Sequence, residues 1–292
     1  MFIANPIYDS VFKYLLDDLE IAKGLLSLIL EEEIVELNFQ PEETRVESPR
    51  IFSPSIIIYR LDFKAVIKTK EGKYEKILIE LQKTRRNSNI MRFRNYLADN
   101  YIKKDGVLLN KGQKEVPLPI VTIYFLGFKL ANILTPILKV CNTYYDIINK
   151  VTLKKKPKEP FILLLNHESY TIQIPRLPAD MRSELEEILS VFKQENINIR
   201  PHLIDYTLEH KKPLHYKVVQ RLIRAVADAD MLKRMRLEDE MEDTLDRELA
   251  EKEDIIAEQK ELIEQKDNAL LEKDNELEEM RKMIAKLQEK SS

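Results

Sequence analysis

Two acidic residues and one amide stand out in Ile56–Gln82, a stretch that reads as two apolar strands joined by a turn at Glu71–Lys73. Residues two apart in a strand share a face, so pairing of these strands brings Asp62, Glu80 and Gln82 to one side of a hairpin. Two carboxylates held close together repel each other, and a divalent cation with oxygen ligands relieves that repulsion. The spacing therefore predicts a metal site on the polar face of the hairpin.

A long helix is expected before this hairpin. Apolar residues recur at helical spacing over Pro6–Glu33, and Asn5 is a suitable N-cap with proline at the first helical position. Asp9 and Lys13 lie one turn apart on this helix. They form either a surface ion pair or, if Asp9 points at the same place as Asp62, part of the site.

Basic residues follow the second strand directly. Lys83, Arg85 and Arg86 lie in a polar break, and a helix expected over Asn89–Lys103 then carries Arg92. A helix N-terminus beside positive charge favours phosphate. The alternative is a solvated basic turn without a ligand.

The order of elements over residues 6–128 indicates an α/β fold with a mixed sheet. A weak strand is expected in Leu37–Phe52, and Pro117–Phe128 is a β-branched and aromatic run typical of a buried strand. The order is then helix, three strands, helix, strand. We expect this core over residues 1–128, and an accessory α/β extension packed on it over residues 129–236.

The accessory region carries weaker signals. Phe161–Leu165 and Tyr170–Ile174 look like a hairpin, and helices are expected over Pro178–Gln194 and Leu214–Arg236. The four histidines have no metal-binding spacing and are interpreted as surface or core residues.

The last segment, residues 237–292, predicts an acidic coiled-coil tail. It lacks Gly and Pro and carries 9 Lys and Arg against 20 Asp and Glu, a net charge of −11. One row repeats apolar residues every seven positions, namely Leu249, Ile256, Ile263, Leu270, Leu277 and Ile284. The other seam row is polar until its end: Lys252, Gln259, Lys266, Lys273, Met280 and Leu287. The tail is therefore either a site of homo-oligomerisation or a single charged helix.

The charge and composition limit the class of protein. Residues 1–236 carry a net charge of +8, which suits a polyanion such as DNA or a merely solvated surface. A single cysteine, Cys141, excludes an internal disulfide and suits a reducing cytosol. The N-terminus lacks the pattern of a signal peptide, and no apolar run is long enough to cross a membrane. We expect a cytoplasmic protein without a membrane partner.

At Asp62 and Glu80-Leu81-Gln82 the sequence resembles the PD-(D/E)XK nuclease superfamily, specifically its Rpn-like branch of recombination-promoting nucleases and putative transposases. In that branch glutamine commonly replaces the last lysine of the motif. The flanking sequence is also similar to this branch over about residues 4–128, in the segments NPIYDSVFKYLL, RLDFKAVI, LIELQK, RFRNYL and PLPIVTIYFLG.

The resemblance implies a restriction-endonuclease-like core and cleavage of DNA phosphodiester bonds that depends on Mg²⁺ or Mn²⁺. It implies that Asp62 and Glu80 bind the metal, that Gln82 takes the place of the motif lysine, and that Asp9 completes the site. The residues expected to face DNA phosphate are Arg92, Lys13, Lys83, Arg85 and Arg86. Two alternatives stay open: a catalytically inactive DNA-binding or assembly protein, and a structural protein built around the coiled coil.

Overall fold

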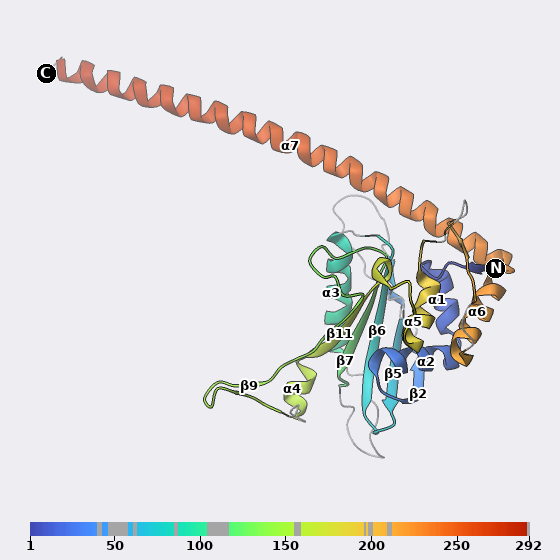
Figure 1. Cartoon of the computed structure of the whole chain (residues 1–292). Helices are drawn as coiled ribbons and strands as arrows, with labels where there is room; N and C mark the ends of the chain where they lie inside the picture. Colours follow the sequence, from blue (N-terminus) through green and yellow to red (C-terminus); the bar gives the residue numbers. More distant parts are fainter. Residues whose placement is uncertain are drawn as a thin grey trace. The chain divides into compact units, whose positions relative to one another are not determined.

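The computed structural model describes residues 1–39, 43–45, 58–60, 63–84, 87–103, 117–154, 159–195, 197, 201–208 and 212–290. The described chain folds as two units, Met1–Arg236 and Leu237–Ser292. The first is a mixed α/β unit around a central sheet, and the second is one long helix (Figure 1).

The central sheet has six strands in the described part of the chain, in the order β2-β5-β6-β7-β11-β8. Strand β5 is antiparallel to both of its neighbours, β2 and β6. Strands β6, β7 and β11 run parallel to one another, and β8 is an antiparallel edge. In sheet order the strands are Ile34–Phe39, Phe63–Thr69, Tyr74–Gln82, Ile120–Leu126, His167–Gln173 and Ile137–Val140.

The predicted hairpin is present as β5 and β6. Gly72 in its turn has φ +82°, a backbone conformation that glycine adopts without strain, and its N–H donates to the Thr69 carbonyl at 2.9 Å. The antiparallel ladder is described from the Lys68–Tyr74 pair to the Phe63–Ile79 pair. Asp62, the residue before Phe63, lies outside the described residues.

Helices cover both faces of the sheet (Figure 1). Helix α3, Asn87–Ile102, lies on one face and confirms the helix expected after the hairpin. Four helices pack on the opposite face: α1 Asp9–Leu16, α2 Leu19–Leu30, α5 Glu184–Leu189 and α6 Pro213–Val226. This arrangement buries the central strands on both faces and confirms the buried strand expected in Pro117–Phe128, which is β7.

The prediction of one helix over Pro6–Glu33 is wrong. The chain forms α1 and α2 because the Asp18 side chain accepts the N–H groups of Glu20 and Ile21 and caps a new helix. Asn5 is not the N-cap of α1. Its side chain accepts the Ile7 N–H at 3.2 Å and donates to Gln194 at 2.8 Å, which ties the N-terminus to a distant loop.

The hairpin expected from Phe161–Leu165 and Tyr170–Ile174 is also wrong. Pro160–Leu164 forms the short helix α4, in which proline takes an early position without losing a hydrogen bond. Strand β11 then pairs parallel to β7 and not with a neighbouring strand in sequence. The expected helix over Pro178–Gln194 is shorter, because α5 ends at Leu189 and passes into the 3-10 turn η2.

Smaller elements complete the first unit. Strands β1 and β12 pair the N-terminus with a late segment of the unit, and β3–β4 and β9–β10 are short antiparallel pairs. Their bounds are Phe2–Ala4, Leu203–Asp205, Glu43–Arg45, Ile58–Arg60, Tyr145–Asp146 and Val151–Thr152, and the 3-10 turns η1 and η2 are Ile174–Arg176 and Ser190–Phe192.

The expected helix over Leu214–Arg236 is interrupted. Helix α6 ends at Val226, and helix α7 begins at Ala229 and runs to Lys290. In α7, every side chain from residue 251 to residue 278 is exposed. Among the described helices, none combines the length and apolarity that a membrane span requires.

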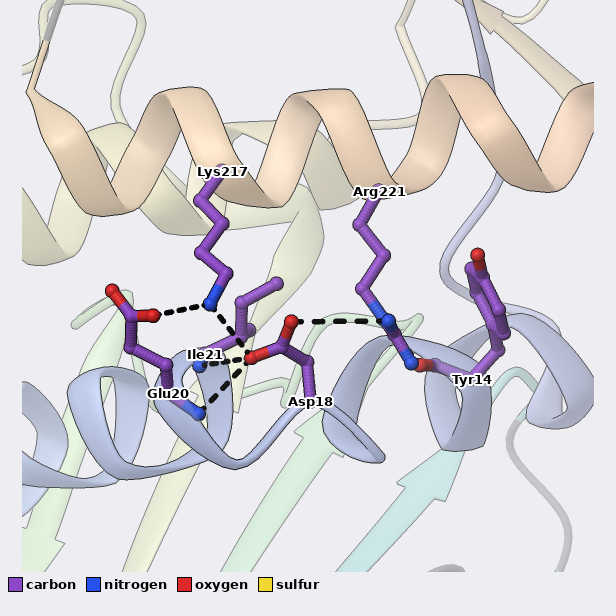
Figure 2. Close-up of polar contacts among 6 residues, drawn as sticks. All are labelled: Tyr14, Asp18, Glu20, Ile21, Lys217 and Arg221. Atoms are coloured by element: carbon purple, nitrogen blue, oxygen red, sulfur yellow. Dashed lines mark hydrogen bonds and ion pairs between the residues drawn. The ribbon is translucent and has the colours of Figure 1, made fainter.

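A polar cluster joins α6 to the junction of α1 and α2 (Figure 2). The Lys217 ammonium lies 3.0 Å from the Asp18 carboxylate and also donates to Glu20. Arg221 donates to the Tyr14 carbonyl at 2.7 Å, and its guanidinium lies 4.2 Å from the centre of the Tyr14 ring. The residue that caps α2 is therefore also the anchor for a helix about two hundred residues later in the chain.

We expect Asp18→Ala to lower the free energy of unfolding by about 1–2 kcal/mol, because it removes both the cap and the partner of Lys217. Asp18→Asn keeps an acceptor oxygen for the cap but loses the charge, so it is expected to lower the free energy of unfolding by less than Asp18→Ala does. The measurement is urea denaturation, with Asp17→Asn as the control because that neighbouring carboxylate is exposed.

The loss caused by Asp18→Asn is expected to depend on pH. Burial acts to raise the pKa of the Asp18 carboxyl, but the Lys217 ammonium and the Ile21 N–H outweigh it and hold the pKa below the usual 3.8. The charged form therefore stabilises the fold above the unfolded-state pKa, and this contribution is lost as the pH falls through the folded-state pKa. A difference between the two proteins that is equally large at neutral pH and at about pH 3 would contradict this.

Candidate functional site

Strand β6 carries the candidate site, and it is buried on both faces from Ile77 to Gln82. Ile77, Ile79 and Leu81 belong to the main core beneath α1 and α2. Leu78 belongs to the smaller core on the α3 face. Glu80 and Gln82 alternate with the main-core residues, so they share the α3 face with Leu78.

Glu80 is wholly buried, at 0% exposure, beside Tyr124 on the adjacent strand β7. Burial raises the pKa of the Tyr124 phenol to about 12, and the negative charge of Glu80 acts in the same direction. The Tyr124 ring also packs on Phe93 of α3, with ring centres 4.6 Å apart. A carboxylate and a protonated phenol thus lie close together under α3.

Gln82 ends the strand, and its side chain is nearly buried at 7% exposure. Its carbonyl accepts the Gly127 N–H at 2.8 Å just beyond the end of β7. A Cβ atom on Gly127 would lie 2.3 Å from the Lys83 carbonyl oxygen and 2.9 Å from Ile7. Only glycine allows the two strand ends to approach so closely, and this contact fixes the backbone next to Gln82.

The start of α1 lies against the same end of β6. The Lys83 ammonium sits over the Tyr8 ring, 4.4 Å from its centre, and Asp9 follows Tyr8 as the first residue of α1. Asp9 forms an ion pair with Lys13 at 2.6 Å, and both side chains are partly exposed. The helical pair is therefore present. The expected approach of Asp9 to Asp62 is not tested, because Asp62 lies outside the described part of the chain.

Only some of the remaining candidate residues lie in the described part of the chain. Arg85 and Arg86 lie outside the described residues, as does the Arg92 side chain, although Arg92 belongs to α3. The described candidates thus form two groups. Glu80 and Gln82 share one face of β6, and Lys83, Asp9 and Lys13 lie around the contact between the end of β6 and the start of α1.

Two residues near Glu80 were not found from the sequence. Thr122 and Tyr124 lie on the α3 face of β7. Thr122 and Tyr124 are two apart in an otherwise apolar run, which is the signal that could have placed them on one face. Which strand they lie beside depends on sheet order.

A cavity of ≈ 480 Å³ lies at the other end of β6 and is not part of the candidate site. Its polar lining includes Lys76, Asn100 and Tyr101. The buried Lys76 ammonium donates to the Asn100 carbonyl at 3.3 Å, near the C-terminus of α3. This lysine stabilises the negative end of the helix dipole.

The residues present are suited to a hard cation. Glu80 and Gln82 both offer oxygen atoms, the ligands that Mg²⁺ prefers. Within the described ranges, no group of three or more His, Cys, Asp or Glu side chains is placed to hold a metal ion. Asp62, the other expected ligand, lies outside those ranges.

Comparisons of the chain with protein-family models, with curated proteins and with solved structures find no match. The site itself is therefore the basis for assigning a function.

Gly127→Ala is expected to lower the free energy of unfolding by about 1–3 kcal/mol, because the added methyl group collides with the Lys83 backbone. Gly24→Ala is the matched control: a Cβ atom there meets only the side chain of Leu214, which can move. Thermal unfolding of both variants tests the expectation, and an equal loss in the two would contradict it.

Proposed function

We propose that this chain is a Mg²⁺-dependent DNA endonuclease with a restriction-endonuclease-like core, linked to mobile DNA or recombination. The observation that carries the proposal is the wholly buried Glu80, which shares the α3 face of a central strand with Gln82. Taking a carboxylate out of water costs free energy that its partners repay only in part. A function at that position is a sufficient reason to keep it.

In this proposal Glu80 and Asp62 hold the metal. Asp62 directly precedes Phe63, whose Cα pairs with that of Ile79, the residue before Glu80. When bound, Mg²⁺ would polarise the phosphoryl oxygen as a Lewis acid and would lower the pKa of a coordinated water. Mn²⁺ is a suitable substitute because it prefers the same oxygen ligands.

The other side chains orient the reacting groups or neutralise the charge of the phosphate. The Gln82 amide can neither carry a positive charge nor accept a proton at neutral pH, so it orients water or phosphate by hydrogen bonds. The Tyr124 phenol beside Glu80 stays protonated at neutral pH because burial raises its pKa to about 12. Asp9 completes the site, and the basic set Lys13, Lys83, Arg85, Arg86 and Arg92 neutralises phosphate charge.

DNA is the proposed substrate because the part of the chain that holds the candidate site carries a net positive charge. Residues 1–236 carry a net charge of +8, and an excess of Lys and Arg attracts the phosphate backbone without reading its sequence.

A catalytically inactive DNA-binding or assembly protein is the second candidate. The observation that favours it is the set of polar neighbours around Glu80. The charge of Glu80 acts on Tyr124, and Lys64 lies on the same face of the neighbouring strand. In such a setting a buried acid serves to hold neighbouring strands together without turnover.

The test of the nuclease is nicking of supercoiled plasmid with Mg²⁺ or Mn²⁺, and with chelator. Glu80→Gln is expected to lower the rate by about a hundredfold or more, because the isosteric amide loses the charge that holds the cation. Glu187→Gln is the matched control, since Glu187 is also a buried acid but lies in α5, on the opposite side of the sheet.

A second readout separates the two candidates. Calorimetric titration with Mn²⁺ is expected to show binding by the wild type and by Glu187→Gln, and none by Glu80→Gln. Equal nicking by the wild type and Glu80→Gln, or nicking that survives chelation, would contradict the proposed nuclease activity. DNA binding by the wild type without metal uptake or nicking would favour the inactive protein.

A further inference from the structure

The second unit exposes an apolar row along its whole middle section. The heptad row of Ile256, Ile263, Leu270 and Leu277 is 50–59% exposed on a continuous helix. A second row beside it, Ile255 and Leu262, is also about half exposed. Apolar rows repeating every seven residues on a long helix are stable when another helix covers them.

The row between these two identifies the orientation of a covering helix. It contains Lys252, Gln259, Lys266 and Lys273, and all four are exposed. In a parallel pair of identical helices in register, each residue of this row faces its own copy. Three lysine–lysine layers would then lie along the seam, and like charges at that distance repel.

An antiparallel pair removes these three layers. With the lysine row of each helix set opposite the apolar row of the other, the centre of the overlap lies between Glu264 and Gln265. Each lysine then faces the apolar row of the other copy, where its long aliphatic stem packs and its ammonium reaches the edge. Lys266 lies opposite Ile263 of the partner copy, and Lys273 lies opposite Ile256 of the partner copy.

The charges flanking the seam also fit this orientation. In the antiparallel overlap Lys260 lies across from Asp267 of the partner copy, and Asp246 lies across from Arg281 of the partner copy. These two attractive pairs outnumber the one repulsive pair of the same row, Glu253 across from Asp274 of the partner copy. By symmetry each pair occurs twice. In the parallel register the corresponding flanking positions place Glu248 beside Glu253 of the partner copy, which is repulsive, and Glu276 beside Arg281 of the partner copy, which is attractive, so these flanks give no net gain. Charge complementarity therefore selects a second copy of this chain in the antiparallel sense.

We propose that the helix from residue 237 to residue 290 pairs with the same segment of a second chain as an antiparallel coiled coil. This pairing sets the first residues of the two coiled-coil segments about 80 Å apart, from the rise of about 1.5 Å per residue. It does not depend on the nuclease activity.

Spin labels on the full-length protein test the orientation, in a Cys141→Ser background because Cys141 is exposed. Thr244→Cys and Gln265→Cys occupy the same heptad position outside the seam. In the antiparallel dimer the label at 265 gives a short distance across the dimer, and the label at 244 gives one of about 60 Å. Two short distances would show a parallel pair, and no dimer distance from either site would show a monomer or another interface. Either result overturns the proposal.

A charge exchange tests the pairing itself by sedimentation equilibrium. Lys260→Glu is expected to raise the dimer dissociation constant about tenfold, since it replaces two attractive contacts per dimer with two repulsive ones. The double variant Lys260→Glu with Asp267→Lys is expected to restore wild-type association. These two residues are too far apart to pair within one helix, so restoration reports contact between chains.

Lys282→Glu is the control, because Lys282 lies outside the seam and pairs within its own helix with Glu278 at 3.0 Å. Its effect on association is expected to be less than about twofold. A double variant as weak as Lys260→Glu alone, or a control as weak as Lys260→Glu, would overturn the antiparallel pairing.

Discussion

Burial of strand β6 on both faces is the constraint on which the first unit depends. A strand with alternating residues in two separate cores needs helices on both sides, and the chain supplies α3 on one and α1, α2, α5 and α6 on the other. The same burial encloses Glu80 in a region of low dielectric constant, where its charge acts strongly on Tyr124. The element that organises the core is thus also the element that carries the candidate chemistry.

Contacts between distant parts of the chain hold the end of β6 in place. Gly127 brings the end of β7 against Gln82, and Tyr8 packs under Lys83. The helix that begins after Tyr8 is then fixed through Asp18 to Lys217 of α6 (Figure 2). The first and last helices of the unit are therefore parts of one support for the candidate site.

The two units differ in how their apolar residues are covered. Met1–Arg236 covers a large cluster of apolar residues within the chain, and Met235 is among the last residues of that core. In Leu237–Ser292 the apolar rows face solvent along the middle of the helix. The two segments also carry opposite net charges, +8 in residues 1–236 and −11 in residues 237–292.

Local pattern alone predicted the β5–β6 hairpin, α3, β7 and the long tail, since each follows from strand alternation, helical spacing or heptads within one segment. It also placed Glu80 and Gln82 on one face of a strand. Tertiary structure decided the division of the first helix at Asp18, the parallel pairing of β11 with β7, and the position of Tyr124 beside Glu80. A periodic pattern fixes which face a residue takes, but the strand beside it is chosen by packing across the whole sheet.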